Sequence, residues 1–178
     1  MFRKMRRERQ LLDEAEAREI LCRGDTEEIL RGGTSGVLAV LGDGGYPYAV
    51  PLSYAYRDGS IYFHCALDGH KTDAIAKNDK VSFCVVDADQ VVPEEYTTHY
   101  RSVIVFGRAH IIQDAAEKRR AIELLADKYA PLLKQDHARE IGQAWKRFYM
   151  VELAIEHMTG KEAIELVRAR QAETGGSV

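Results

Sequence analysis

The most informative segment of the chain is Tyr62-Phe63-His64-Cys65-Ala66-Leu67-Asp68-Gly69-His70-Lys71. Its aromatic first half predicts a β-strand, and the residues from Gly69 onward predict a turn that opens a short helix over about 69–77. The first N–H groups of a helix have no partner within the helix, so a histidine and a lysine beside them favour a phosphate. We therefore expect this strand-to-helix turn to bind an anionic ligand.

Strand patterns surround this segment. Val37–Leu41 is a compact apolar run, and Tyr46–Tyr56 has apolar residues at every second position. Asp58-Gly59 predicts a tight hairpin turn into a strand over Ile61–Ala66. Three strands with short connections are therefore expected in the first half of the chain.

Three more strands are predicted farther along, at Val81–Val86, Ser102–Ile112 and Arg147–Ile155, the second with a bulge or bend at Gly107. The polar segment Asp87–Tyr100 contains Pro93 and predicts a loop, which we expect to lie over a site. Six strands with mostly hairpin links predict an antiparallel sheet that closes into a barrel.

Helices are expected around this barrel. Capping patterns predict N-terminal helices over about 13–31 and a helix that starts at Asp114 and is stopped by Pro131. A further helix is expected near His137–Trp145, and the C-terminal tail over about 160–178 predicts a short helix that frays. Without repeats or a clear linker, residues 1–178 are expected to form one domain, mainly β with peripheral helices. Side chains fill a barrel this small, so a ligand would bind outside it, with a partner subunit as the lid.

Bulk properties exclude several kinds of function. A formal net charge of −3 argues against a nucleic-acid-binding protein. No apolar run approaches the roughly 18 residues that would cross a membrane. Cys22, Cys65 and Cys84 are few and not at metal-ligand spacing, which indicates reduced thiols in a cytoplasmic protein. The histidines and carboxylates likewise do not form a metal-binding pattern.

Strand parity divides the polar candidates. His64 shares a face with Tyr62, whereas Cys65 shares the opposite face with Phe63. Taken singly, each of these residues has an ordinary structural explanation. His64 fits a half-buried histidine bonded to backbone, Cys65 fits a buried structural thiol, and Lys71 fits a solvated helix residue. Their joint position at the turn after Gly69 is what favours a binding site.

The blocks Tyr46–Tyr54, Ile61–Ala66 with Gly69 and Lys71, and Ser102–Ala109 together resemble a known family. They are similar to the FMN-binding split-barrel flavoproteins related to pyridoxamine 5′-phosphate oxidase, and most closely to the nitroimidazole-resistance branch. The likeness runs from about Gly36 to Pro131. It implies a six-stranded antiparallel split β-barrel that forms a homodimer with FMN in the clefts between subunits.

The resemblance also implies roles for particular residues. Backbone groups of Val50, Pro51, Leu52 and Ser53 would border the flavin ring, and His64 and Cys65 match flavin-contacting positions. His70 and Lys71 match an Arg-Lys pair that holds the phosphate, but a histidine lacks the permanent charge and the two-pronged geometry of arginine. Ser102 matches a polar residue that the partner chain contributes. The substrate-binding C-terminal segment of the oxidase itself is not recognisable.

Three functions are consistent with the sequence. The first is an FMN-dependent oxidoreductase that reduces a small planar acceptor such as a nitroaromatic compound, with His64 as the tentative catalytic residue. The second is a flavin- or haem-binding protein without efficient turnover, in which His64, His70 or His99 would ligate the haem iron. The third is a structural dimer whose flavin site has decayed.

Overall fold

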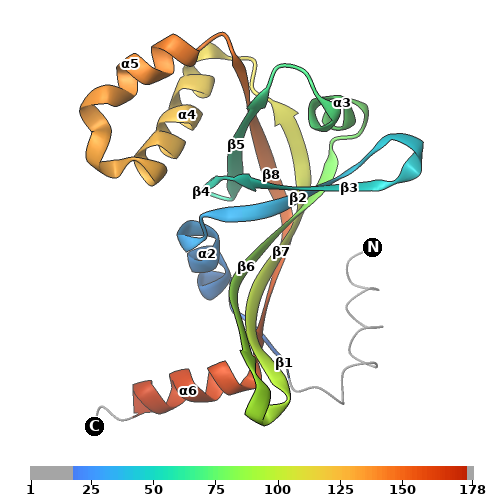
Figure 1. Ribbon diagram of the computed structural model, residues 1–178, viewed down its shortest axis with the longest axis vertical. Helices are drawn as coiled ribbons and strands as arrows, with labels where there is room; N and C mark the ends of the chain where they lie inside the picture. The colour runs from blue at the N-terminus through green and yellow to red at the C-terminus, as the bar shows by residue number, and fades with distance from the viewer. Residues whose placement is uncertain (1–17, 176–178) are drawn as a thin grey trace.

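Strands with alternating buried and exposed residues dominate the chain, and helices lie around them (Figure 1). The computed structural model describes residues 18–175. Its strands are β1 (Arg18–Ile20), β2 (Ser35–Leu41), β3 (Pro47–Ser53), β4 (Ala55–Arg57), β5 (Ser60–Ala66), β6 (Lys80–Val92), β7 (Thr97–Ile111) and β8 (Phe148–Ala163). Its α-helices are α2 (Arg23–Gly32), α3 (His70–Lys77), α4 (Ala115–Tyr129), α5 (Lys134–Ala144) and α6 (Ile164–Gly175).

The strands form one antiparallel sheet in the order β3-β2-β6-β7-β8-β5-β4, and β1 pairs with the end of β8. The two ends of this order, β3 and β4, are separated in the chain by Tyr54 alone. The sheet therefore curls, and its two end strands are joined through Tyr54. Hydrogen bonds between β3 and β4 do not close it into a barrel. A mainly β fold with peripheral helices is confirmed; the detail of a six-stranded barrel is not.

The structure has eight strands among the described residues and not six, because β1 was not predicted and because the strand expected over Tyr46–Tyr56 breaks at Tyr54. The Tyr54 side chain is fully buried, and its ring packs edge-on against Phe83 at a centroid distance of 5.0 Å. The Tyr129 hydroxyl, at the end of α4, accepts the Tyr54 N–H at 2.9 Å and lies 2.9 Å from the Tyr54 carbonyl. A side chain thus satisfies the backbone at the break, as buried polar groups require.

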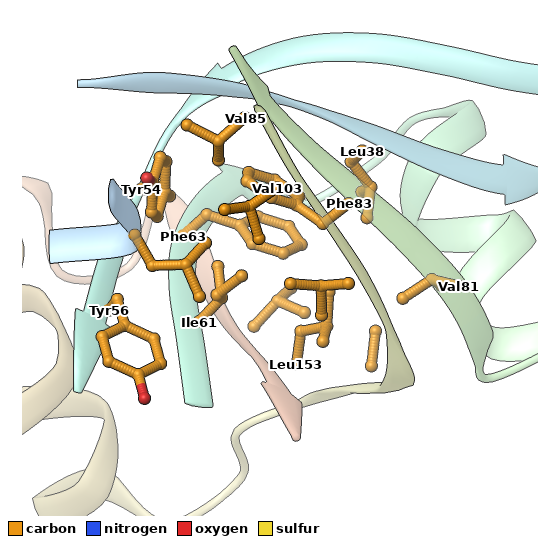
Figure 2. Close-up of a cluster of buried hydrophobic side chains, with 14 of the residues drawn as sticks. Leu38, Tyr54, Tyr56, Ile61, Phe63, Val81, Phe83, Val85, Val103 and Leu153 are labelled. Atoms are coloured by element: carbon orange, nitrogen blue, oxygen red, sulfur yellow. The ribbon is translucent and has the colours of Figure 1, made fainter. Parts of the chain in front are cut away.

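Large side chains from the strands fill the interior of the curled sheet (Figure 2). Phe63, Phe83 and Leu153 are all fully buried there. The interior is therefore filled by side chains, as the sequence predicted, and leaves the outer surface as the place where a ligand is expected.

The segment expected to be a loop over Asp87–Tyr100 is instead a long hairpin. β6 and β7 pair through it as far as Val92 and Thr97, and a short 3₁₀ turn at Pro93–Glu95 joins them. The prediction of a loop was wrong because the polar composition was taken as a sign of irregular backbone. The segment is a polar hairpin because this arm extends beyond the core and exposes much of its surface. It forms the lower end of the molecule, with α6 beside it (Figure 1).

The helix predictions are confirmed with changed limits in several cases. α3 begins at His70, and α4 begins after Asp114, whose carboxylate accepts the Glu117 N–H at 2.8 Å. Residues 13–17 of the helix expected to run to about Arg23 lie outside the described residues. The prediction is wrong for 18–20, which are strand because they pair with β8. The tail expected from 160 is the end of β8 followed by α6, of which residues up to 175 are described.

Candidate functional site

The start of α3 is open to a ligand. Gly69 precedes the helix with a φ of 148°, a backbone conformation that favours glycine, and no side chain caps the helix there. The Thr72 hydroxyl donates to the Gly69 carbonyl at 2.6 Å and so leaves the N–H groups of the first turn without a side-chain acceptor. These N–H groups and the positive end of the helix dipole favour an anion.

Strand β5 brings His64 and Cys65 to this point on opposite faces. Cys65 is 5% exposed and packs in the core, and burial raises the pKa of its thiol while the charge of Lys71 opposes that rise. Its side chain therefore faces away from solvent, as strand parity predicted. Only the Cys65 backbone can reach an external ligand.

His64 is exposed, and its ring lies edge-on to Phe148 at a centroid distance of 6.3 Å. Partial burial of the ring lowers the pKa of His64, and the charge of Lys71 lowers it further. His64 is therefore neutral near pH 7, with one ring nitrogen as a donor and the other as an acceptor. The end of β5 and the first turn of α3 lie close together because only Leu67, Asp68 and Gly69 separate Ala66 from His70.

His70 makes its contacts on the side of α3 that faces the β2–β3 turn. Its Nδ1 lies 3.4 Å from a carboxylate oxygen of Asp43, and its ring packs edge-on against Tyr48 at 4.7 Å. The resemblance assigned His70 and Lys71 to the same phosphate. Lys71 makes no ion pair among the described residues, whereas His70 contacts Asp43 and Tyr48.

Residues Val50 to Ser53 lie on β3, at one end of the sheet. Val50 and Leu52 are half-buried against the core, and Pro51 and Ser53 face outward. In the described part of the chain β3 pairs with β2 alone, so its other edge has backbone groups available. This edge is suited to hydrogen bonds with the polar rim of a flat ligand.

Ser102 lies far from the other candidates within one chain. His64 pairs with Met150 on β8, whereas Ser102 pairs with Lys161 on the same strand. Met150 and Lys161 are eleven positions apart, which corresponds to roughly 36 Å along a strand. One chain therefore does not bring Ser102 and His64 to the same ligand.

The outer face of β3, β2, β6, β7 and β8 carries two rows of outward residues without a lysine, arginine, aspartate or glutamate. Their cross-strand order is Pro51–Val37–Cys84–Ile104–Thr159 and Ala49–Ala39–Ser82–Phe106–His157. We call these ten residues the uncharged face. Charged side chains return at its borders, with Lys80 and Arg108 on one side and Lys161 on the other. An outer sheet face of this composition is typical of a surface that another molecule covers.

Sequence reasoning missed the surroundings of His64. Lys118 donates to the carbonyls of Trp145 and Phe148 at 2.9 and 2.7 Å and lies over both rings, so it fixes the aromatic wall beside His64. Tyr62, on the same face of β5, contacts Glu152 at 3.2 Å. Only the register of β5 against β8 brings these groups together, and no local pattern could have revealed it.

Asp43 was also missed, although it lies in the glycine-rich segment Gly42-Asp43-Gly44-Gly45 between two predicted strands. Its carboxylate accepts from Lys77 at 2.8 Å as well as facing His70. Lys77 is the first cause of the lowered pKa of Asp43, by its hydrogen bond and its charge. Asp43 therefore remains an anion close to the start of α3.

Two further observations limit the kinds of site. None of the helices in residues 18–175 is both long enough and apolar enough to span a bilayer. The same described residues contain no cluster of three or more histidines, cysteines, aspartates or glutamates placed to hold a metal ion.

The fold and the site together define a class: proteins with a curled antiparallel sheet, a filled interior and an uncapped helix start at an external strand-to-helix turn. The profile of the family described as pyridoxamine 5′-phosphate oxidase matches residues 23–162, and the chain belongs to that family. No protein of curated function matches the chain in sequence.

Solved structures agree with this fold. A protein provisionally described as a 5-nitroimidazole antibiotic resistance protein, from Bacteroides thetaiotaomicron, is 20% identical over 82% of this chain and 87% of its own, with a TM-score of 0.70. A FAD-binding protein from Mesorhizobium loti is 27% identical over 82% of this chain and 98% of its own, with a TM-score of 0.62. A FAD- and haem-binding protein from Mycobacterium smegmatis is 20% identical over 83% of this chain and 74% of its own, with a TM-score of 0.68.

Proposed function

We propose that the chain is a flavin-dependent oxidoreductase that works as a homodimer. The observation that carries the proposal is the uncapped start of α3 beside Lys71, on the outer surface of a sheet whose interior is full. Membership of the pyridoxamine 5′-phosphate oxidase family supports a flavin nucleotide as the anion. FMN is the cofactor that the sequence resemblance implies, while two of the similar structures are named for FAD.

The residues of the site have distinct tasks in this proposal. Lys71 and the first N–H groups of α3 hold the phosphate end, and the free edge of β3 offers backbone groups to the polar rim of the ring system. The flavin, when bound, supplies the exchange of electrons with a donor and an acceptor. His64, neutral at pH 7, stands beside that ring and is able to donate or accept a proton.

The dimer is part of the proposal because the site is incomplete in one chain. Ser102 reaches a flavin near His64 only if a second copy supplies it, since the partners of the two residues on β8 lie roughly 36 Å apart along that strand. The uncharged face extends across the sheet toward Ser102 and gives the second copy a surface to cover. The acceptor we propose is a small planar molecule, a nitroaromatic compound being the example that the resemblance suggests.

The visible spectrum of the purified protein tests this function. The expected result is a set of absorption bands close to those of free flavin. These bands should bleach when a nicotinamide donor is added and recover when a nitroaromatic acceptor is added afterwards. A flavin spectrum without any turnover would favour the alternative of a binding protein. A strong Soret band would instead point to haem, and a colourless protein that takes up neither group would contradict the proposal.

A further inference from the structure

Glu162, near the end of β8, is a buried carboxylate that the proposed function does not use. It is 1% exposed, and two arginines hold it: Arg170 of α6 at 3.0 Å and Arg101 of β7 at 3.4 Å. A charge buried this deeply is costly unless cations and hydrogen bonds surround it, and the loss of one partner leaves it poorly compensated. The position of α6 is therefore tied to the charge at the end of β8.

Each of the two arginines also binds a second carboxylate. Arg170 contacts Asp25 of α2 at 3.0 Å, and Arg101 contacts Asp87 of β6. Asp87 is the residue left unpaired at the bulge in β6, where the register against β7 shifts. The order Asp25, Arg170, Glu162, Arg101, Asp87 alternates in charge and joins α2, α6, β8, β7 and β6. We call these residues the charge chain.

Apolar packing contributes little to the attachment of α6. Within residues 164–172, Val167 is the one buried side chain of the helix, at 2% exposure. A cavity of about 300 Å³ lies between α6, α2 and the base of the β6–β7 arm, and both arginines of the charge chain line it. α6 therefore meets α2 through an ion pair at the edge of a cavity, and the charge chain is its principal link to the sheet.

Ser102 and Lys161 lie on the other side of the strands that carry the buried pair. Ser102 pairs with Lys161, one register position from the pairing of Arg101 with Glu162. Because side chains alternate across a strand, Ser102 and Lys161 face outward at the border of the uncharged face, while the buried pair faces α2 and α6. A shift of Arg101 or Glu162 therefore moves the backbone that positions Ser102.

We propose that α6 is a strap: through the charge chain, its docking fixes the ends of β7 and β8, and the contribution of Ser102 to the flavin site of a second copy depends on Arg170. Arg170 and Glu162 are positioning residues, since neither touches the flavin. The part of this inference that concerns flavin rests on the proposed function. The link between α6 and Ser102 belongs to the chain itself.

Hydrogen exchange of the flavin-free protein tests this link. Arg170→Ala is expected to speed amide exchange in the segments 101–103 and 160–163 by about tenfold or more, because the buried carboxylate loses a partner and the local structure opens. The pairing of β5 with β8 around Val151 should keep its protection. Arg168→Ala is the matched control, since Arg168 is exposed on the same helix without an ion pair among the described residues, and it should change neither region.

A double-mutant cycle on FMN affinity, measured by fluorescence titration, tests whether the link acts through Ser102. Ser102→Ala and Arg170→Ala are each expected to weaken FMN binding by about two- to tenfold, the scale of one neutral hydrogen bond. The double variant should lose no more than Ser102→Ala alone, because no serine remains for Arg170 to position. Losses that multiply would overturn the inference, as would unchanged exchange in Arg170→Ala.

The two measurements separate this inference from the proposed function. An unaltered protein that binds no flavin would refute the proposed function. The exchange of the segments 101–103 and 160–163 would still decide whether α6 fixes the ends of β7 and β8. Exchange that rises only within α6 itself would show that the helix detaches without moving the strands, and the strap would then be wrong.

Discussion

Lys71 is the residue on which the electrostatics of the proposed site depends. It belongs to the first turn of α3, and its charge acts on the pKa values of both His64 and Cys65. Replacing Lys71 with alanine is expected to weaken the binding of a flavin nucleotide by about 1.5–3 kcal/mol, the usual value of a hydrogen bond to a charged group. Calorimetric titration measures the change.

Riboflavin, which lacks a phosphate, separates this role from a general effect on the protein. Its affinity should stay the same in the Lys71→Ala protein. Lys134→Ala, at an exposed position on α5, should alter the binding of neither ligand. An equal loss of riboflavin and nucleotide affinity would show that Lys71 supports the fold and not the phosphate.

The coupling between His64 and Lys71 gives a second prediction for single residues. Partial burial and then the charge of Lys71 lower the pKa of His64 below its usual value near 6.5. The Lys71→Ala variant should therefore have a His64 with a higher pKa, measured by NMR titration of the histidine ring signals. An unchanged His64 titration would mean that the two side chains lie farther apart in solution.

The same lowered pKa fixes the sign of the effect of pH on stability. Below about pH 6.5 the unfolded chain binds a proton at His64 that the folded protein binds less readily. His64 therefore lowers the free energy of unfolding as the pH falls from 6.5 toward its folded-state pKa, and has no such effect above that range.

At the level of strands and helices, Gly107 of β7 lies opposite a bulge in β8, where Glu156 is the extra residue. The pairing register shifts between Phe106 and Gly107, and a Cβ at Gly107 would clash with the backbone oxygen of Ala154. Gly107→Ala is expected to lower the free energy of unfolding by more than about 2 kcal/mol, since backbone atoms have to move to accept the methyl group.

Gly142 provides the control for this prediction, because a Cβ there meets no atom within 4 Å and the residue lies in α5. Gly142→Ala should leave stability unchanged or raise it by up to about 1 kcal/mol through helix propensity. Urea denaturation of both variants measures the difference. Similar stabilities for the two proteins would contradict the close approach at the bulge.

The strands that the sequence predicted well are those whose pattern is local. Alternation placed Cys65 in the core and His64 outside. The glycine within the strand pattern of β7 lies at the irregularity, although the extra residue there is Glu156 of β8 and not Gly107 itself. The break at Tyr54 was not predictable in this way, because its backbone is satisfied by Tyr129, 75 residues farther along the chain. The role of His70 was missed for the same reason: its partners, Asp43 and Tyr48, belong to another hairpin.

For the whole molecule, the decisive question is what covers the uncharged face. Val37, Cys84 and Ile104 form a continuous cross-strand row there, and Val37 is 38% exposed. If a second copy of the chain packs on this surface, as the proposed function requires, Val37→Glu places a charge inside the contact at a cost of several kcal/mol without disturbing the core behind it. The variant is expected to be a folded monomer that no longer retains flavin.

Sedimentation velocity combined with the absorbance of bound flavin measures both consequences. Leu132→Glu is the control, because Leu132 is 89% exposed on the turn between α4 and α5, away from the uncharged face, and its substitution should leave a flavin-loaded dimer. A dimer that survives Val37→Glu with its flavin would place the contact elsewhere. A monomer that keeps its flavin would show that one chain completes the site, and Ser102 would then have no part in it.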